Sequence, residues 1–444
     1  MTTKVDQLDV FIVFGEVFHG GYIQGLLAQA KKNSASIIYS TMGRRDSDQK
    51  LRPLNKEELL KKNKELNLSN NDLLINIPLE AGFDLEIYQE QTLVDCINKY
   101  GLKNWENFVI DDDFLLTVKK EASIKFKKQI KKFLIQVSSH IKENTKNIYF
   151  IHTMAGGIPR SKLVMAVLNR VLKGRGKRFY SSEKFYNTGL GKVSLESFKS
   201  VTAESFKNLI TETKDLRSLW AKKNINVSYS AFGYRGNSIL IKNQYQWTAY
   251  APYIQGWAKL ELEDIAQKAK DNNINTNVFN CPEVLTRSSQ TFSGIEVFLY
   301  PFLNSLNSAS SDLILKKIGD LKIIQDLLNQ LGYKSLKQDS FINYFNKDFS
   351  FVKLKQLTDN FFTDSSLENQ LNHDLWPQHN NSKQMDLMIE ATLELNKYII
   401  PETKLLFHTQ LSLILIYLAG NQIYKQLGSK KTVQNLTHES LLHE

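Results

Sequence analysis

Short apolar runs alternate with longer amphipathic stretches over the first two thirds of the chain, and this alternation constrains the fold more than any other feature. The run at 9–14 (DVFIVF) has the length of a buried strand, and the stretch at 23–32 has helical spacing. Strands that alternate with helices predict an α/β fold, a doubly wound parallel sheet of the Rossmann type with helices on both faces. Strands are expected at 9–14, 36–40, 73–77, 147–152, 226–232 and 276–280, and helices at 23–32, 123–143, 163–172 and 256–271.

The pattern changes near residues 304–311, where asparagine, serine and alanine gather and the strand signals end. Beyond this point the chain has the spacing of helices separated by polar loops. We therefore expect an α/β domain over 1–303 and a helical C-terminal region over 304–444. Within that region the apolar run 411–420 (LSLILIYLAG) is too short to span a membrane and predicts a buried helix.

The composition argues against several classes of protein. The chain has 444 residues but only two cysteines, Cys96 and Cys281, so we expect no disulfide framework, no cysteine-rich metal site and a reducing, cytoplasmic location. We also expect no signal peptide and no integral membrane span, because no apolar stretch is long enough. The net charge of +11 favours an acidic partner, but the basic residues are scattered, so nucleic acid is not expected.

A glycine cluster follows the first expected strand, at Gly15, Gly20 and Gly21. Glycines at this place allow the backbone to approach a pyrophosphate, and the next helix adds N–H groups and the positive end of its dipole. The G-x-G-x-x-G fingerprint is absent, and His19 takes the middle position of the related G-x-x-x-G-x-G spacing. The cluster indicates either a dinucleotide-binding turn or a tight turn without a ligand.

The ends of the second and fourth expected strands carry further candidates. In a dinucleotide-binding fold the second strand ends beside the adenosine ribose, where arginine accommodates a 2′-phosphate. Ser40, Arg44 and Arg45 lie there and favour NADPH over NADH. NADH stays open as a cofactor, because Asp46 follows and because both arginines can equally face solvent. The fourth strand leads into Ala155–Gly156, small residues that either approach the nicotinamide ribose or form a plain turn.

The stretch 227–259 holds the candidate acid. A nicotinamide-dependent reduction needs a group that protonates the product, and a tyrosine can do so when a nearby ammonium lowers its pKa. Lys259 lies on an expected helix, but Gln255 stands one turn before it, so the common Tyr-x-x-x-Lys pair is absent. Tyr250 and Tyr253 are the candidate acids, and Tyr250 can act with Lys259 only if it precedes the helix. The alternative is that these aromatic residues pack internally and the lysine faces solvent.

Tyr250 and Lys259 resemble the Tyr-x8-Lys signature of the FabV-type trans-2-enoyl-acyl carrier protein and enoyl-CoA reductases, in the short-chain dehydrogenase/reductase superfamily. The segments 286–289 (TRSS) and 295–303 (IEVFLYPFL) are similar to the turn and the apolar segment that cover the acyl site of this family. The resemblance extends over residues 8–303. It implies that residues 1–303 form a dinucleotide-binding reductase domain.

The resemblance implies NAD(P)H-dependent reduction of the 2,3-double bond of an enoyl thioester in fatty-acid or related acyl-chain synthesis. The acyl group would be carried by acyl carrier protein, whose acidity suits the basic chain, or by coenzyme A. The resemblance implies that Tyr250 is the proton donor and that Lys259 binds the cofactor ribose and tunes the tyrosine. It also implies that Gly15 and Gly21 bind the pyrophosphate. Thr286 and Ser288 would contact the nicotinamide or its phosphates.

The chain resembles a divergent member, because the family's second tyrosine falls on Leu240 or Ala231, with Tyr234 as a substitute. Two alternatives remain: another short-chain reductase activity, such as 3-oxoacyl reduction, and a non-catalytic protein that binds a dinucleotide or an acyl carrier. The segment 186–193 (YNTGLGKV) lacks the first glycine and the final Ser or Thr of a P-loop, and no G-x-S-x-G elbow occurs. The sequence predicts no metal site and no oligomeric state.

Overall fold

The computed structural model describes residues 8–18, 20–172, 180, 182–234, 238–241, 244–247, 254–286, 289, 299, 302, 365–366, 401–436 and 438–443. Its main sheet has seven strands: β1 (Leu8–Phe14), β2 (Ser36–Thr41), β5 (Leu73–Pro78), β8 (Thr145–His152), β9 (Asn226–Gly233), β12 (Asn275–Asn280) and β14 (Val433–Asn435). Their order is β14-β12-β9-β8-β1-β2-β5, and every neighbouring pair is parallel. The chain leaves β1 toward one edge and later returns to the other side of β1 with β8, so a crevice is expected at the carboxyl ends of these two strands.

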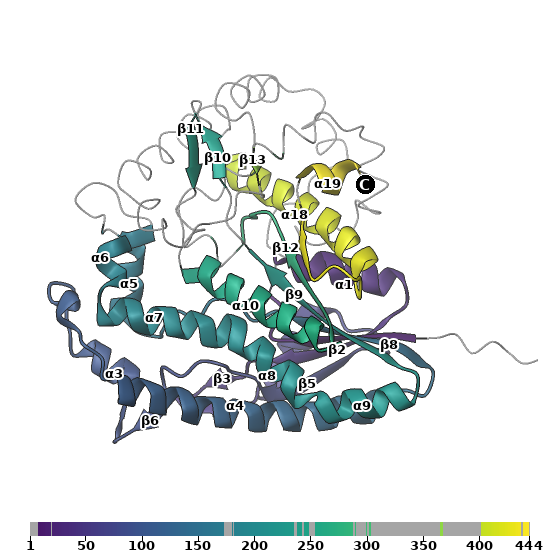
Figure 1. Ribbon diagram of the computed structural model, residues 1–444, viewed down its shortest axis with the longest axis horizontal. Coiled ribbons are helices and arrows are strands. Elements are labelled where there is room, and N and C mark those ends of the chain that lie inside the picture. The colour runs from purple at the N-terminus through teal and green to yellow at the C-terminus, as the bar shows by residue number, and fades with distance from the viewer. Residues whose placement is uncertain are drawn as a thin grey trace, which may run out of the picture.

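Helices cover both faces of this sheet (Figure 1). The longer ones are α1 (Tyr22–Lys32), α2 (Lys56–Leu66), α4 (Asp112–His140), α5 (Lys162–Leu172), α7 (Gly189–Lys199), α8 (Ser205–Glu212), α9 (Lys214–Lys222), α10 (Ile254–Asp271) and α18 (Pro401–Gln426). Shorter helices are α3 (Leu93–Asn98), α6 (Ser182–Tyr186), α19 (His438–His443), a 3-10 turn η1 (Trp105–Asn107) and a π-helical segment η3 (Ser200–Glu204) between α7 and α8.

The side chains of β1 show how the two faces are filled. Phe11 and Val13 point to one face, where they join a buried cluster with α1 and α18. Ile12 and Phe14 point to the other face, where the cluster includes α4, α8 and α10. This alternation is the period of two that a strand imposes, and it explains why β1 is apolar throughout. A third cluster joins α3, α5, α7 and the first half of α4.

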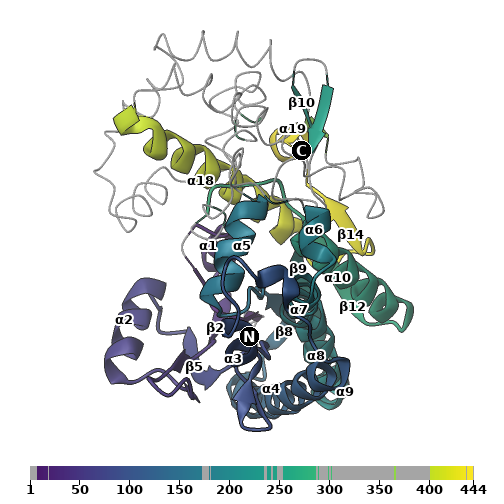
Figure 2. The same cartoon turned by 90° about the vertical axis from the view of Figure 1, so that its left-hand side faces the viewer.

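The backbones of α1 and α18 touch. A Cβ added at Gly25 would lie under 3.0 Å from the carbonyl of Ile416, and one added at Gly420 would meet the backbone of Gly25 equally closely. Figure 2 shows α18 running across the top of α1. The predicted helical C-terminal region is confirmed by this helix, and the apolar run 411–420 is buried within it.

The sequence predicted the strands of the sheet up to β12 and missed β14, whose three residues (VQN) form no apolar run. The helix expected at 123–143 begins earlier, at Asp112, because the Asp111 side chain accepts a hydrogen bond of 2.7 Å from the Phe114 N–H and caps it. The boundary at 303/304 stays a prediction, although α18 packs on the main sheet and β14 is one of its edge strands.

Small sheets of two or three short strands lie outside the main sheet. They are β3 (Arg44–Arg45) with β4 (Leu51–Arg52), β6 (Ile87–Tyr88) with β7 (Gln91–Thr92), and β10 (Ser238–Ile241) with β11 (Gln244–Trp247) and β13 (Ser365–Ser366). The first pair holds the two arginines that follow β2. No helix in the described part of the chain is apolar for long enough to cross a membrane.

Candidate active site

A cavity of about 300 Å³ opens at the carboxyl ends of the central strands. Its walls come from the segments that follow β1, β8, β9 and β12 and from the first turns of α1 and α10. This is the crevice that the strand order predicts, because the sheet changes direction between β1 and β8. Among the described residues, those that line it and were predicted from sequence are Gly21, Ala155, Lys259 and Thr286.

The turn after β1 is built around Gly15, whose φ of +120° is a conformation that side chains rarely adopt. A Cβ there would lie under 3.0 Å from the Thr153 Oγ1 at the end of β8, so only glycine fits. The Ser40 hydroxyl accepts a hydrogen bond of 2.9 Å from the Gly15 N–H and donates one of 3.1 Å to its carbonyl. Ser40 is buried, so its hydroxyl holds the turn rather than facing the cavity.

The next residue, Glu16, is the centre of a buried ion cluster. Its carboxylate accepts two hydrogen bonds of 3.0 Å from Arg44, one on each oxygen, and lies 2.9 Å from the Lys62 Nζ. Lys62 extends from α2 and also donates 2.9 Å to the carbonyl of Val17. Burial opposes ionisation of Glu16, but hydrogen bonds from Arg44 and the charge of Lys62 lower its pKa overall. Lys62 also pairs with Glu65 at 3.7 Å, so two cations meet two anions in this cluster.

Arg45 belongs to a second cluster. Its Nη2 lies 2.9 Å from Glu80, which also pairs with Arg160. Arg160 in turn lies 3.5 Å from Asp84, whose other oxygen accepts 2.7 Å from the Arg160 N–H. Two cations meet two anions here, so Arg45 is neutralised and does not face open solvent as a free charge.

Lys259 projects from the first turns of α10 into the cavity and is only 5% exposed. It donates a hydrogen bond to the carbonyl of Phe232 at the end of β9. Burial lowers the pKa of Lys259 to about 8, against the weaker opposing effect of the nearby Cys281 and Glu263. The alternative of an ordinary surface lysine is therefore wrong, and this amine changes charge close to neutral pH.

Two tyrosines also bond at the cavity wall. Tyr234, directly after β9, donates to the carboxylate of Glu283, and Tyr22, at the start of α1, donates to the carbonyl of Pro282. The segment after β12 therefore receives hydrogen bonds from both sides of the cavity. Tyr234 is the residue that the sequence suggests in place of the second tyrosine of the FabV-type reductases.

The predicted Thr286 forms a reciprocal turn with Ser289. The Thr286 N–H donates 2.7 Å to the Ser289 Oγ, and the Ser289 N–H donates 3.0 Å to the Thr286 Oγ1. Leu285, one residue before, is held to α18 because its N–H donates 3.0 Å to the Ser412 hydroxyl. The C-terminal helix thus positions one wall of the cavity.

The other predicted residues divide into two groups. Gly20 and Gly156 both have positive φ, +80° and +85°, and Gly156 accepts 3.1 Å from the Thr202 hydroxyl, which fixes the turn after β8. Tyr250, Tyr253 and Ser288 lie outside the described residues, as does His19. Within the described residues α10 covers Ile254–Asp271, and the requirement that Tyr250 precede this helix stays a prediction.

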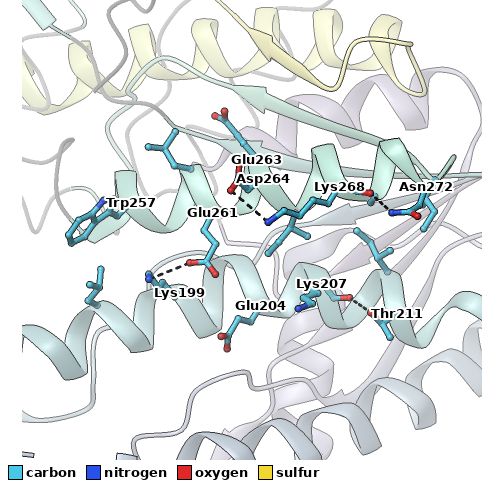
Figure 3. Close-up of a pocket in the computed structure, with 16 residues that line it drawn as sticks. Lys199, Glu204, Lys207, Thr211, Trp257, Glu261, Glu263, Asp264, Lys268 and Asn272 are labelled. Carbon is cyan, nitrogen blue, oxygen red and sulfur yellow. Dashed lines mark hydrogen bonds and ion pairs between the residues drawn. The ribbon is translucent and has the colours of Figure 1, made fainter. Parts of the chain in front are cut away.

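A larger groove of about 1060 Å³ lies between α10 and the segment α7-η3-α8 (Figure 3). Lys199 and Glu261 form an ion pair across it at 3.6 Å, and Lys268 pairs with Asp264 on α10 itself at 4.0 Å. One of these ion pairs joins two helices and the other lies within one helix, and the charged side chains do not converge on one point (Figure 3), so the smaller cavity is the candidate active site. No group of side chains suited to a metal ion occurs within the described ranges.

Comparison with known proteins agrees with this geometry. Residues 2–443 match the family described as enoyl-acyl carrier protein reductase FabMG. This chain belongs to that family. A solved apo structure of FabMG, a novel type of enoyl-acyl carrier protein reductase, is 32% identical, with a TM-score of 0.77 over 100% of this chain and 95% of that one. An NADH-bound FabMG structure is 28% identical, with a TM-score of 0.65 over 99% of this chain and 95% of that one. No curated protein sequence matches the chain.

The membership confirms the prediction of an NAD(P)H-dependent enoyl-acyl carrier protein reductase of fatty-acid synthesis and identifies its family as FabMG. It also covers the C-terminal residues, which the sequence resemblance did not reach. Sequence reasoning missed Glu16, Lys62 and Glu283, because an isolated charged residue in a loop or on an amphipathic helix gives no signal of burial. Gln255 was noticed only as the residue that breaks the Tyr-x-x-x-Lys pattern.

Proposed function

We propose that the cavity beyond β1, β8, β9 and β12 is where this chain binds a nicotinamide dinucleotide beside an enoyl thioester and reduces the 2,3-double bond. The observation that carries the proposal is the buried Lys259, which faces the same cavity as the segment that follows the Gly15 turn. A buried amine with a pKa near neutrality is typical of an active site and is costly elsewhere. When bound, the reduced nicotinamide supplies the hydride that adds to the β-carbon.

The described residues fit the diphosphate of such a cofactor. Gly20 has a positive φ and nothing within 4 Å of where its Cβ would lie, so the backbone there is open to a close approach. Helix α1 begins after Gly21, and neither a capping side chain nor an acidic residue in the first turn neutralises its positive end. Both features favour an anion at this position. Gly20, Ala155, Gly156, Thr286 and Ser288 complete the proposed cofactor contacts.

We further propose Tyr250 as the proton donor, with Tyr253 as second candidate, and Lys259 as the amine that supports it. The Tyr234 hydroxyl donates a hydrogen bond to the Glu283 carboxylate, so this tyrosine holds the cavity wall that follows β12. An ammonium beside a phenol favours the phenolate and so eases proton release to the substrate. The partial loss of charge of Lys259 near pH 8 ties this support to pH.

The choice of cofactor depends on Arg44. The sequence pattern favours NADPH, but both nitrogens of the Arg44 fork are bonded to Glu16, and Arg45 is paired with Glu80. A 2′-phosphate would have to compete with a buried carboxylate for the same donors. We therefore propose NADH as the preferred donor, which the NADH-bound FabMG relative supports. In this proposal Glu16→Gln lowers the KM for NADPH relative to NADH, while Glu57→Gln, at an exposed position on α2, leaves the ratio unchanged.

We propose acyl carrier protein as the preferred carrier of the substrate, with the coenzyme A thioester as a poorer one. The net charge of +11 suits an acidic protein. The basic segment 173–178, outside the described residues, is the predicted contact, and its neutralisation should raise the KM for the carrier-bound substrate only. The two free cysteines support the predicted cytoplasmic location.

The proposal is tested by following the loss of nicotinamide absorbance with 2-enoyl thioesters and, separately, with 3-oxoacyl thioesters. We expect turnover of the enoyl substrates alone. Tyr250→Phe should abolish turnover, while the same change at Tyr253 should have a smaller effect. Unchanged turnover in Tyr250→Phe would remove that residue as the acid, and turnover of only the 3-oxoacyl substrate would refute the proposed reaction.

A further inference from the structure

Gln255 is a buried amide on the wall of the candidate active site. It lies on α10 one turn before Lys259, so the two side chains share a helix face. Gln255 is 6% exposed and lines the same cavity. Within the described part of the chain its Nε2 has no hydrogen-bond partner.

A donor in this state is costly. Leaving a buried amide N–H unpaired costs about 1–3 kcal/mol, so such groups are rare in folded proteins unless a ligand or water completes them. Two other donors on the cavity wall each have an acceptor: Lys259 donates to the Phe232 carbonyl, and Tyr22 donates to that of Pro282. The Gln255 amide therefore remains as a donor that faces the cavity.

We propose that Gln255 is a substrate-binding residue, whose Nε2 donates a hydrogen bond to the thioester carbonyl oxygen of the bound enoyl chain. This inference rests on the proposed function of the cavity. When a hydride adds to the β-carbon, the electron pair of the double bond moves toward the carbonyl, and its oxygen gains negative charge. A fixed N–H donor stabilises that charge, and an amide does so without itself titrating.

The test compares Gln255→Leu with the parent enzyme, and Gln267→Leu is the matched control, since Gln267 is exposed on the same helix and its Nε2 donates to Asp271. We expect Gln255→Leu to lower kcat/KM for the enoyl thioester by about 100-fold, the effect of removing one donor to a developing oxyanion. The dissociation constant for NADH, titrated by fluorescence, should stay within about twofold of the parent value. The melting temperature should not fall, because a buried unpaired amide is removed.

A second variant distinguishes chemistry from packing. Gln255→Glu should be active only at low pH, where the protonated carboxyl still donates. Its activity should therefore fall as the pH rises through the pKa of that carboxyl, a decline that the parent lacks. Weaker NADH binding with an unchanged KM for the enoyl thioester would overturn the inference and assign the amide to the cofactor. A destabilised Gln255→Leu with normal kinetics would overturn it in favour of a structural role. Absence of turnover in the parent would instead refute the proposed function itself, and this inference with it.

Discussion

Replacing Lys259 with methionine should stabilise the protein at neutral pH while it removes the reductase activity. Burial lowers the pKa of this amine from 10.5 to about 8. Between these two values the unfolded chain holds the proton and the folded chain does not, so the folded state gains stability as the pH rises through this window. Below about pH 8 the fold must bury a charged amine, and the cost is present in full.

The size of the effect follows from the shift. At about 1.4 kcal/mol for each unit of pKa, the buried charge lowers the free energy of unfolding by about 3 kcal/mol at pH 7. At pH 9.5 the same calculation leaves about 1 kcal/mol. The stability advantage of Lys259→Met should therefore shrink by about 2 kcal/mol between the two pH values. The lost hydrogen bond to the Phe232 carbonyl offsets part of the advantage at both.

Urea unfolding followed by tryptophan fluorescence measures this difference at each pH. The control is Lys268→Met, because Lys268 lies on the same helix with 77% of its side chain exposed. We expect no pH-dependent change for the control. A stability difference between Lys259→Met and the parent that stays constant or grows with pH would refute the conclusion that burial depresses the pKa of this amine.

Three further predictions concern the same site and its support. The kcat/KM of the parent should decline above about pH 8 as Lys259 loses its proton. Lys259→Arg should move this decline to higher pH in the pH–rate profile. Gly15→Ala should destabilise the protein by about 2–3 kcal/mol in urea unfolding through its clash with Thr153, while Gly20→Ala, with open space around it, should cost about 1 kcal/mol of backbone strain. Burial holds the pKa of His152 well below 6.5, so acidification below that value protonates only the unfolded state. The parent should lose up to about 1.4 kcal/mol per pH unit there, and His152→Gln should lose less, as urea midpoints at about pH 5 and 7 will show.

The sequence was sufficient to predict the sheet strands up to β12, because each is an apolar run, and it predicted α1, α4, α5, α10 and the buried part of α18. It did not predict α2, α7, α8 and α9. It also located the glycine turn and Lys259, since both are tied to strand ends and helix starts. It did not reveal the partners of Arg44 and Arg45. Glu16 and Glu80 come from different strand ends, and only the parallel sheet brings them beside the arginines.

Burial was the other quantity that the sequence did not supply. Lys62 belongs to a polar helical stretch and Glu16 is a single charged residue after an apolar strand, and their low exposure arises because α2 folds over the turn that follows β1. The strand β14 was missed for a related reason: its three residues acquire their place from β12 and from the hydrogen bonds of Asn280, and not from any pattern of their own.

The contact between α1 and α18 has a consequence for how the protein is made. The apolar face of α1 emerges early from the ribosome, but the helix that covers it and the strand that completes the sheet lie in residues 401–435. At about 5–20 residues per second, roughly 20–80 s of synthesis separate the two. The nascent chain must keep that surface from aggregating for the whole interval, and a message truncated before α18 should produce insoluble polypeptide instead of a smaller reductase.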